Sequence, residues 1–319
     1  MKCSYISSDA SESSEAVLFH GRYLKETNHF IEHGRFQNRH QKWVFFENEP
    51  PTNVWKAVSA NRSYWNWFNV TATFTQDSDI PIRNNFPQCM PRLKWKSSGE
   101  NYARGKSKMV VWFVSHCRTS SKRELYVAEM QKYLNVDIFG KCGKQSNCPR
   151  DLSTTKPGKC MTDLIEKDYK FYLSFENAIC SEYITEKILR VIVGTNVIPV
   201  VLGGADYASI LPKGSYIDIR DFKSVRELTE HLLHVDRNDT LYNQYISAKY
   251  SFHCVSYNTF MCDLCEYLHE HRYQEQLVFD AGAFWSPERR CVNPKNFFTD
   301  VAPEIVPKIR FYSNPELFI

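Results

Sequence analysis

A short segment in the second half of the chain holds residue types suited to a charged substrate. Residues 175–187 read Phe-Glu-Asn-Ala-Ile-Cys-Ser-Glu-Tyr-Ile-Thr-Glu-Lys and follow an apolar run. The pattern predicts a buried strand that opens into a helix, whose first N–H groups and positive dipole end suit a phosphate. Lys187 is unfavourable for a helix start, and such local conflicts are expected at functional sites. The alternative is a solvated helix face that carries Glu186 and Lys187.

The elements before this segment form a strand–helix–strand unit. Residues 109–114 are fully apolar, as in a strand that is buried on both faces. A helix is predicted over 121–134, with Ser121 and Glu124 as a capping box. A second strand is predicted over 136–139.

A second unit of the same kind contains the segment itself. Strands are predicted over 169–175 and 197–202, with a helix between them, and a further helix begins at a capping box of Ser224 and Glu227. This alternation predicts a parallel sheet with helices on both faces. Ligands of such sheets bind beyond the carboxyl ends of the strands, so the informative loops follow Ser115, Phe175 and Leu202.

The two ends of the chain have a different character. The first 15 residues are polar and are expected to be mobile. Residues 16–24 and 41–51 contain apolar runs between breakers, which predict short strands. The last 50 or so residues are aromatic and rich in proline, and we expect them to pack across the domains as a tail.

Composition narrows the class of protein and its compartment. The 319 residues carry a net charge of only +4, which does not favour nucleic acid as a partner. The 11 cysteines are mostly scattered, and 262–265 (Cys-Asp-Leu-Cys) is the one C-x-x-C, so disulfides are favoured over a metal site. We therefore predict that Cys262 and Cys265 are both oxidised. An odd count leaves at least one thiol unpaired or bonded to another chain, and the oligomeric state stays open.

Three glycosylation sequons also indicate an oxidising compartment. Their asparagines are Asn61, Asn69 and Asn238. The chain opens without a signal peptide and has no run of 18 apolar residues. Either the chain is a truncated or secreted form, or the inference of an oxidising compartment is wrong.

The stretches "YKFYLSFENAICSEYITEK" and "VIPVVLGGADY" together resemble a known donor-site signature. It is the signature of the α1,3/α1,4-fucosyltransferases of glycosyltransferase family 10, which the chain therefore resembles. Further blocks match in the same order from about Ala16 to about Leu268: "AVLFHGR", "QKWVFFENEPP", "FNVTATFTQDSDI", "VVWFVSHC", "SKRELYV" and "CDLC".

The resemblance implies an α/β fold of the GT-B type, with two Rossmann-like domains facing across a cleft. It places an acceptor-side domain at 16–105 after the mobile segment 1–15, a GDP-fucose-binding domain at 106–252, and a C-terminal helix and tail at 253–319. The implied reaction inverts the fucose anomeric carbon and needs no metal, with a divalent cation at most as a stimulant. Asp77 and Asp79 fall in a block of the family that we interpret as structural.

Carried over residue by residue, the resemblance assigns the donor contacts. Arg123 and Lys187 match the diphosphate contacts, and fixed cations stabilise the charge that a leaving GDP gains. Asn177, Tyr183 and Glu186 match further donor contacts. The family usually has asparagine where this chain has His116, which changes the shape of that contact and can titrate near neutrality.

The acceptor side carries the implied catalytic base. The acceptor hydroxyl must lose its proton, and Glu49, which two prolines follow, matches the acceptor-side carboxylate of the family. Glu47 is a rival two residues away.

The acceptor is expected to be an N-glycan of a glycoprotein in the Golgi. The insertion at 140–171 and the tail at 284–294 look more like invertebrate and plant enzymes that modify the innermost N-acetylglucosamine than like antennal, Lewis-type enzymes. A non-catalytic glycan- or nucleotide-binding relative and a glycosyltransferase with another nucleotide sugar are the alternatives.

Overall fold

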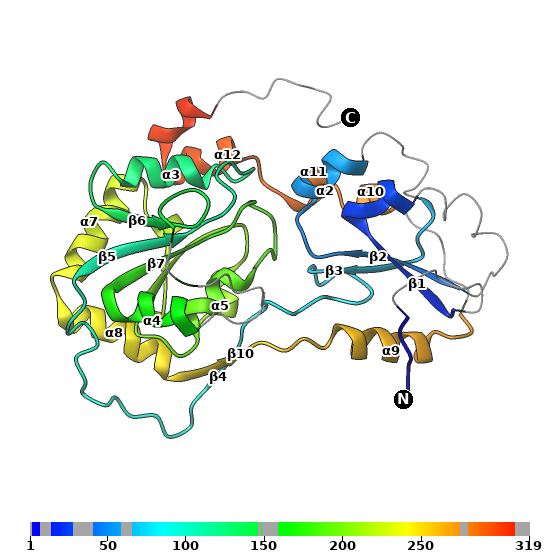
Figure 1. Ribbon diagram of the computed structural model, residues 1–319, viewed down its shortest axis with the longest axis horizontal. Coiled ribbons are helices and arrows are strands. Elements are labelled where there is room, and N and C mark those ends of the chain that lie inside the picture. The colour runs from blue at the N-terminus through cyan, green and yellow to red at the C-terminus, as the bar shows by residue number, and fades with distance from the viewer. Residues whose placement is uncertain are drawn as a thin grey trace.

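The computed structural model describes residues 2–6, 14–27, 41–58, 66–145, 148, 159–274 and 280–309. Two parallel sheets organise these residues (Figure 1). The smaller sheet has the order β1-β2-β3, with strands Ala16–His20, Lys42–Glu47 and Val70–Thr73. The larger has the order β6-β5-β7-β8-β9, with β5 Lys108–Phe113, β6 Val136–Phe139, β7 Tyr169–Phe175, β8 Ile198–Leu202 and β9 Ile217–Asp218.

Helices and a small two-stranded antiparallel sheet surround these two sheets. The antiparallel pair is β4 (Gln88–Pro91) and β10 (Phe252–Val255). The longer helices are α2 Pro51–Val58, α3 Arg123–Met130, α4 Lys159–Asp168, α5 Glu186–Ile192, α7 Val225–Asp236, α8 Asp239–Tyr250, α9 Phe260–Glu270 and α12 Pro294–Val301. The short ones are η1 Gly21–Thr27, α6 Tyr207–Ile210, η3 Ile219–Asp221, α10 Ala281–Phe284, α11 Pro287–Arg290 and η4 Pro303–Lys308.

The larger sheet is covered on both faces, as its apolar strands predict. All seven residues of β7 are buried. On one face, Phe171 and Leu173 pack with residues of α3, α7, α8 and α12. On the other face, Tyr172 packs with Ile165 of α4 and Val191 of α5. Burial on both faces explains why these strands read as continuous apolar runs.

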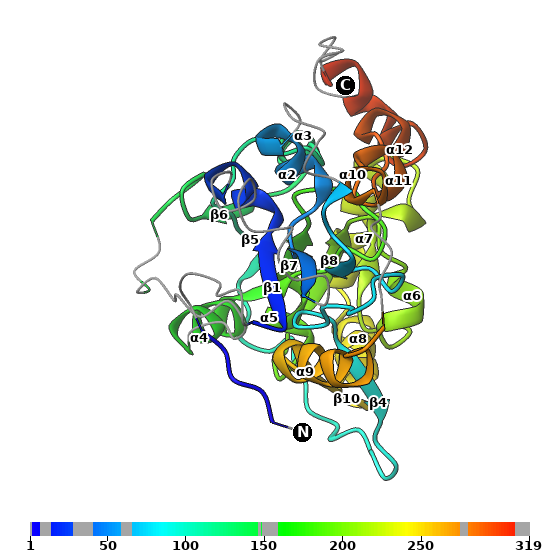
Figure 2. The ribbon, with the colours of Figure 1, turned by 90° about the vertical axis from the view of Figure 1, so that its right-hand side faces the viewer.

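The C-terminal tail joins the two sheets. Phe260 and Leu264 of α9 cover one face of the smaller sheet, and Ala281 and Trp285 cover its other face. Phe298 and the residues after it then enter the core of the larger sheet. Figure 2 views the molecule from the side of the smaller sheet. In this view, α9 lies near the bottom of the molecule and α12 near the top. The tail therefore packs across both halves of the chain, as expected; the domain boundaries stay predictions.

One of the two predicted capping boxes is wrong. The N-cap of α3 is Lys122, which has φ 58°, and not Ser121. The Ser121 hydroxyl instead donates to the carbonyl of Glu176 over 2.7 Å, so a tertiary contact has taken the group that the local pattern assigned to the helix. At α7 the prediction is confirmed in part, because the Ser224 hydroxyl accepts the N–H of Glu227.

The prediction that both cysteines of 262–265 are oxidised is wrong for Cys262. Cys265 pairs with Cys3, whereas Cys262 is exposed and has no disulfide partner among the described residues. Four more disulfides join Cys89 to Cys254, Cys117 to Cys142, Cys148 to Cys160 and Cys180 to Cys291. Segment 2–6 runs beside α9 and brings Cys3 to Cys265, a pairing across 262 residues that no local pattern reveals.

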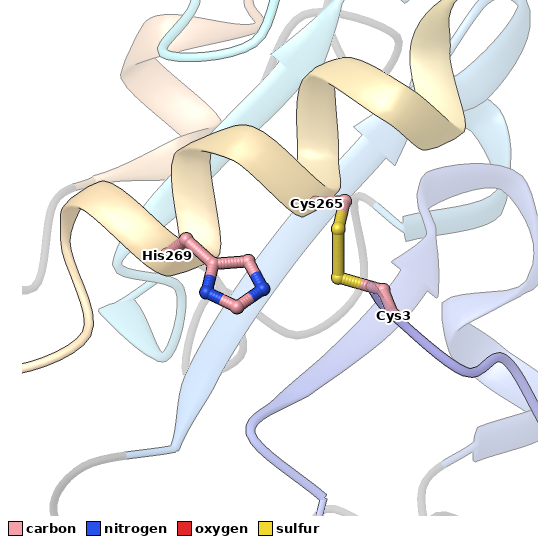
Figure 3. Close-up of side chains that lie close together, drawn as sticks. All are labelled: Cys3, Cys265 and His269. Carbon is pink, nitrogen blue, oxygen red and sulfur yellow. A yellow bond between two sulfur atoms is a disulfide. The ribbon is translucent and has the colours of Figure 1, made fainter. Parts of the chain in front are cut away.

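His269 lies close to the Cys3–Cys265 disulfide (Figure 3). The two sulfur atoms are bonded to each other, so they are not thiolate ligands for a metal. Among the described residues, no helix is long and apolar enough to cross a bilayer.

Candidate active site

The loops that follow β5, β7 and β8 meet at the carboxyl edge of the larger sheet. The N–H of Ser121 and the hydroxyl of Ser120 both donate to the carbonyl of Asn177, over 3.0 and 2.9 Å. The N–H of Glu176 donates to the carbonyl of Leu202 over 2.8 Å. The three loops identified from the sequence therefore form one hydrogen-bonded unit.

Gly204 allows the loops after β7 and β8 to approach each other closely. A Cβ atom at this position would lie 2.6 Å from the carbonyl oxygen of Cys180. Any larger residue would push the two loops apart, because the obstructing atoms belong to the backbone.

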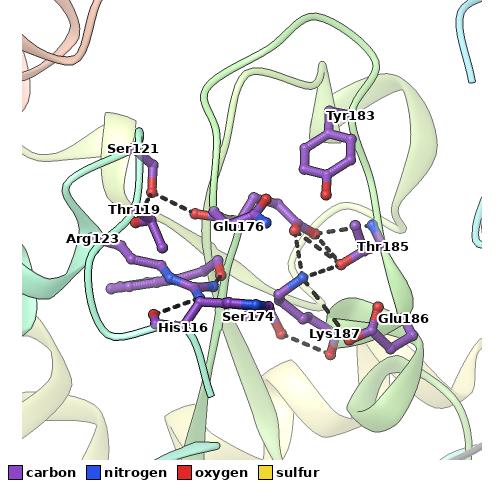
Figure 4. A network of polar contacts seen from close by, with 12 residues as sticks. His116, Thr119, Ser121, Arg123, Ser174, Glu176, Tyr183, Thr185, Glu186 and Lys187 are labelled. Atoms are coloured by element: carbon purple, nitrogen blue, oxygen red, sulfur yellow. Dashed lines mark hydrogen bonds and ion pairs between the residues drawn. The ribbon is translucent and has the colours of Figure 1, made fainter. Parts of the chain in front are cut away.

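Glu176 is the buried centre of this edge, and no motif in the sequence had identified it. Its side chain is 2% exposed. Its carboxylate accepts the N–H of Thr185 over 3.0 Å, the Thr185 hydroxyl over 2.9 Å, and the ammonium group of Lys187 over 2.9 Å (Figure 4). Burying a carboxylate is costly, and the cation and the donors around Glu176 compensate its charge. The feature of the sequence that could have identified Glu176 is its position directly after a fully buried strand.

Lys187 and Glu186 open α5 beside this centre. The side chain of Lys187 is 15% exposed, and its ammonium group has Glu176 as its near counter-ion. The Glu186 carboxylate lies 3.2 Å from Arg190 and 3.9 Å from Lys187. Burial opposes ionisation of Glu186, but the two cations outweigh it and hold its pKa below the ordinary value.

Arg123 is buried rather than presented to solvent. It is 3% exposed, and its guanidinium group donates to the carbonyls of Phe175 and His116. Burial lowers its pKa, and the ring of Trp112 lies 5.5 Å from the guanidinium carbon. Arg123 thus ties the start of α3 to the end of β7.

Two buried polar atoms lack a hydrogen-bond partner among the described residues of this edge. They are the Asn177 amide oxygen and Nε of Arg123. Buried polar atoms are normally satisfied, so unpaired ones beside a loop cluster are candidates for contact with a ligand or with ordered water.

Tyr183 links this edge to the other half of the chain. It is 2% exposed, and its ring lies 5.0 Å from that of Phe74. Its hydroxyl points toward the Glu176 network in Figure 4 and lies 3.5 Å from Oε2 of Glu49. Next to it, Glu182 has φ 61° and accepts the N–H of Gln76 over 2.6 Å. The donor and acceptor candidates therefore meet at Tyr183.

The two rival carboxylates have different surroundings. Glu47 ends β2 with a side chain that is 0% exposed, whereas the side chain of Glu49 is 32% exposed. Glu49 lies 3.3 Å from Arg22, and its second oxygen accepts the amide of Asn53 over 3.0 Å. Only Glu49 of the pair is accessible to a substrate.

Asp77 and Asp79 are occupied by protein donors. Asp79 accepts the N–H of Thr71 over 2.7 Å, and Asp77 pairs with Arg290 over 2.8 Å and with Arg289 over 3.0 Å. These contacts support the structural interpretation of the two residues.

The sequence and the fold match known proteins. The family model "Glycosyltransferase family 10 (fucosyltransferase) C-term" matches residues 103–283, and "Fucosyltransferase, N-terminal" matches residues 2–85. Alpha-(1,3)-fucosyltransferase C of Drosophila melanogaster is 32% identical over 295 residues, which cover 86% of this chain and 66% of that protein. Glycoprotein 3-alpha-L-fucosyltransferase A of the same organism is 37% identical over 274 residues, which cover 84% and 50%.

A crystal structure of α1,3-fucosyltransferase with GDP matches with a TM-score of 0.50 and 16% identity, covering 86% of this chain and 96% of that one. The likeness shows a shared fold, so the α/β architecture is of the GT-B type that the resemblance implied. With family models matching both halves, the chain belongs to glycosyltransferase family 10, the fucosyltransferases.

Proposed function

We propose that this chain transfers L-fucose from GDP-fucose to an N-acetylglucosamine hydroxyl of a glycoprotein N-glycan, with inversion at the anomeric carbon. The observation that carries the proposal is the meeting of Tyr183, on the loop after β7, with Glu49, on the loop after β2. An inverting transfer needs a donor site and a base on opposite sides of one reacting carbon.

In the proposed reaction, the acceptor hydroxyl oxygen forms a bond to the anomeric carbon of fucose. The bond from that carbon to the diphosphate oxygen breaks, and its electron pair leaves with GDP. Glu49 takes the proton of the acceptor hydroxyl. Its partial exposure supports this role, because a base must reach the substrate, and the complete burial of Glu47 argues against the rival.

The proposed donor site is the carboxyl edge of the larger sheet. Lys187 contacts the diphosphate while it stays paired with Glu176, and Arg123 contributes positive charge from beneath the loop. Asn177, Tyr183 and Glu186 complete the donor contacts, and the unpaired amide oxygen of Asn177 supports this placement. In this proposal, residues 16–105 form the acceptor-side lobe and residues 106–252 form the donor-side lobe.

For the acceptor, we propose the innermost N-acetylglucosamine and a location in the Golgi lumen or membrane. The insertion at 140–171 and the tail at 284–294 support this choice over an antennal sugar. The name of the second relative supports only a glycoprotein acceptor. We also propose that no metal is obligatory, so turnover should persist in EDTA.

The test is incubation with labelled GDP-fucose and a panel of N-glycans. Transfer to the innermost sugar, with an α-linkage read by linkage-specific fucosidases, is the expected result. Transfer to antennal sugars alone would show that the acceptor is an antennal sugar and not the innermost one. GDP-fucose binding without transfer would indicate a non-catalytic relative. A Glu49→Gln variant should still bind GDP and lose about 10²–10⁴-fold in turnover, the usual effect of losing a general base. Glu47→Gln should be distinctly more active than Glu49→Gln.

A further inference from the structure

The buried carboxylate of Glu47 organises the loop that carries Glu49. Oε1 of Glu47 accepts the N–H of Asn48 over 3.0 Å and that of Glu49 over 2.8 Å. Oε2 accepts the N–H of Arg22 over 2.9 Å. Three backbone donors therefore converge on one carboxylate, and one of them belongs to Glu49 itself.

Arg22 connects the two carboxylates a second time. Its guanidinium nitrogen lies 3.6 Å from Oε1 of Glu47 and 3.3 Å from Oε1 of Glu49. Among the described residues, His20 is a further titratable group beside Glu47, with its Nδ1 3.5 Å from Oε2, and Tyr183 faces Glu49 from the opposite lobe. Burial and the charge of Arg22 lower the pKa of His20, which favours a neutral ring next to Glu47.

The packing leaves Glu47 little freedom. A Cβ atom at Gly21 would lie 2.9 Å from Oε2 of Glu47 and 3.0 Å from the ring of Phe45. The carboxylate is thus held in a tight site made by η1 and β2, while the side chain of Glu49 remains partly open to solvent.

We propose that Glu47 is a positioning residue that, in its ionised form, holds Glu49 in place for proton abstraction through the backbone at 48–49 and through Arg22. This inference rests on the proposed role of Glu49 as the base.

Protonation of Glu47 should disturb both connections. An ionised carboxylate only accepts hydrogen bonds, which suits the three N–H groups that face it. A protonated carboxyl group carries an O–H that must point at one of these donors or lose its own partner. Neutral Glu47 also no longer forms an ion pair with Arg22. The guanidinium group of Arg22 then stabilises the negative charge of Glu49 alone, which makes that carboxylate a weaker base.

Glu47 should gain or lose its proton within the pH range of a normal activity assay. Burial raises the pKa of Glu47 to about 7, although the charge of Arg22 and the backbone N–H groups of Arg22 and Asn48 pull it down. Because the pKa is raised, Glu47 gains its proton as the pH falls through 7. Turnover of the wild-type enzyme should then drop about tenfold between pH 8 and pH 6, as for one essential group with that pKa.

The experiment compares kcat against pH for the wild-type chain and Glu47→Gln at saturating GDP-fucose and acceptor. Glutamine mimics the neutral carboxyl group, so the variant should lose about 10- to 100-fold at pH 8, the scale of a misplaced catalytic group. It should be nearly flat between pH 8 and pH 6, while the KM for GDP-fucose stays within about twofold, because the donor binds to the other lobe. A purely structural role would lower kcat equally at every pH.

The matched control is Glu129→Gln, which replaces another buried carboxylate that is paired with lysines, far from the smaller sheet. It should keep the pH profile of the wild type. If Glu47→Gln keeps wild-type turnover and its acid limb while Glu49→Gln is inactive, the positioning inference fails and the proposed function stands. If Glu49→Gln is fully active, the base assignment fails and the inference fails with it.

A second variant covers the case in which Glu47→Gln does not fold. Arg22 is 35% exposed, so Arg22→Gln should fold, and it removes the cation that lowers the pKa of Glu47. The acid limb of kcat should therefore move to higher pH. A limb that stays in place would contradict the inference.

Discussion

The hydroxyl group of Tyr183 lies 3.5 Å from the carboxylate of Glu49 across the two lobes of the molecule. The two residues are 134 positions apart in the chain and stand on loops that follow strands of different sheets. Their proximity connects the loop that carries the donor-site signature with the proposed base.

Tyr183→Phe removes this contact and leaves the packing against Phe74 in place. One hydrogen bond contributes about 0.5–1.5 kcal/mol, so we expect kcat to fall about 2- to 10-fold with little change in thermal stability. Steady-state kinetics and a melting curve measure both effects. Tyr126→Phe is the control, because the hydroxyl of Tyr126 is buried without a partner among the described residues. The control should keep full activity, and a fully active Tyr183→Phe would show that the contact is not used.

Variants of the Lys187–Glu176 ion pair should have separable effects on catalysis and on the stability of the fold. Lys187→Ala should cost about 2–4 kcal/mol of transition-state stabilisation, measured from kcat/KM, because a fixed cation near the leaving diphosphate is lost. It should also destabilise the fold, since Glu176 is left buried without its counter-ion.

The double variant Lys187→Met with Glu176→Gln tests this separation. It removes both charges and keeps a side-chain oxygen for the N–H of Thr185, so stability should return toward the wild-type value. Activity should stay low. Recovery of activity together with stability would show that Lys187 serves the fold alone.

Cys262 should be the one thiol that reacts in the native, unreduced protein. It is exposed on α9, and the other ten cysteines are paired. Alkylation followed by mass mapping should label Cys262 and recover the peptide of Cys3 joined to that of Cys265. Cys262→Ser should remove the label and leave turnover unchanged. A disulfide between Cys262 and Cys265 would contradict this pairing.

Of the two described sequons, Asn238 is the better glycan acceptor. It is exposed at the N-cap of α8, whereas Asn69 is half-buried and its amide oxygen accepts the N–H of Trp43 over 2.7 Å. Asn61 lies outside the described residues. Thr240→Ala removes the Asn238 sequon and preserves the cap. It should reduce the mass of protein from a secretory host by one glycan, while Asn69→Asp should not change the mass by a glycan.

Local pattern and motif were enough to predict much of this protein from its sequence. The apolar runs at 109–114 and 169–175 predicted buried parallel strands, because strands covered on both faces have no polar side. The alternation of strands and helices predicted the loops that meet at Glu176 and Asn177. The family was identified from a donor-site signature at 169–187 and 197–207 and several shorter blocks.

Tertiary structure alone decided the contacts between distant segments. Ser121 caps no helix because the loop after β7 lies within its reach, and Cys265 pairs with Cys3 because segment 2–6 runs beside α9. Glu47 and Glu49 are indistinguishable as residue types, yet the end of β2 turns one into the core and leaves the other at the surface. Burial, ion pairing and disulfide partners depend on which groups the whole chain brings together, and that information is absent from any local stretch of sequence.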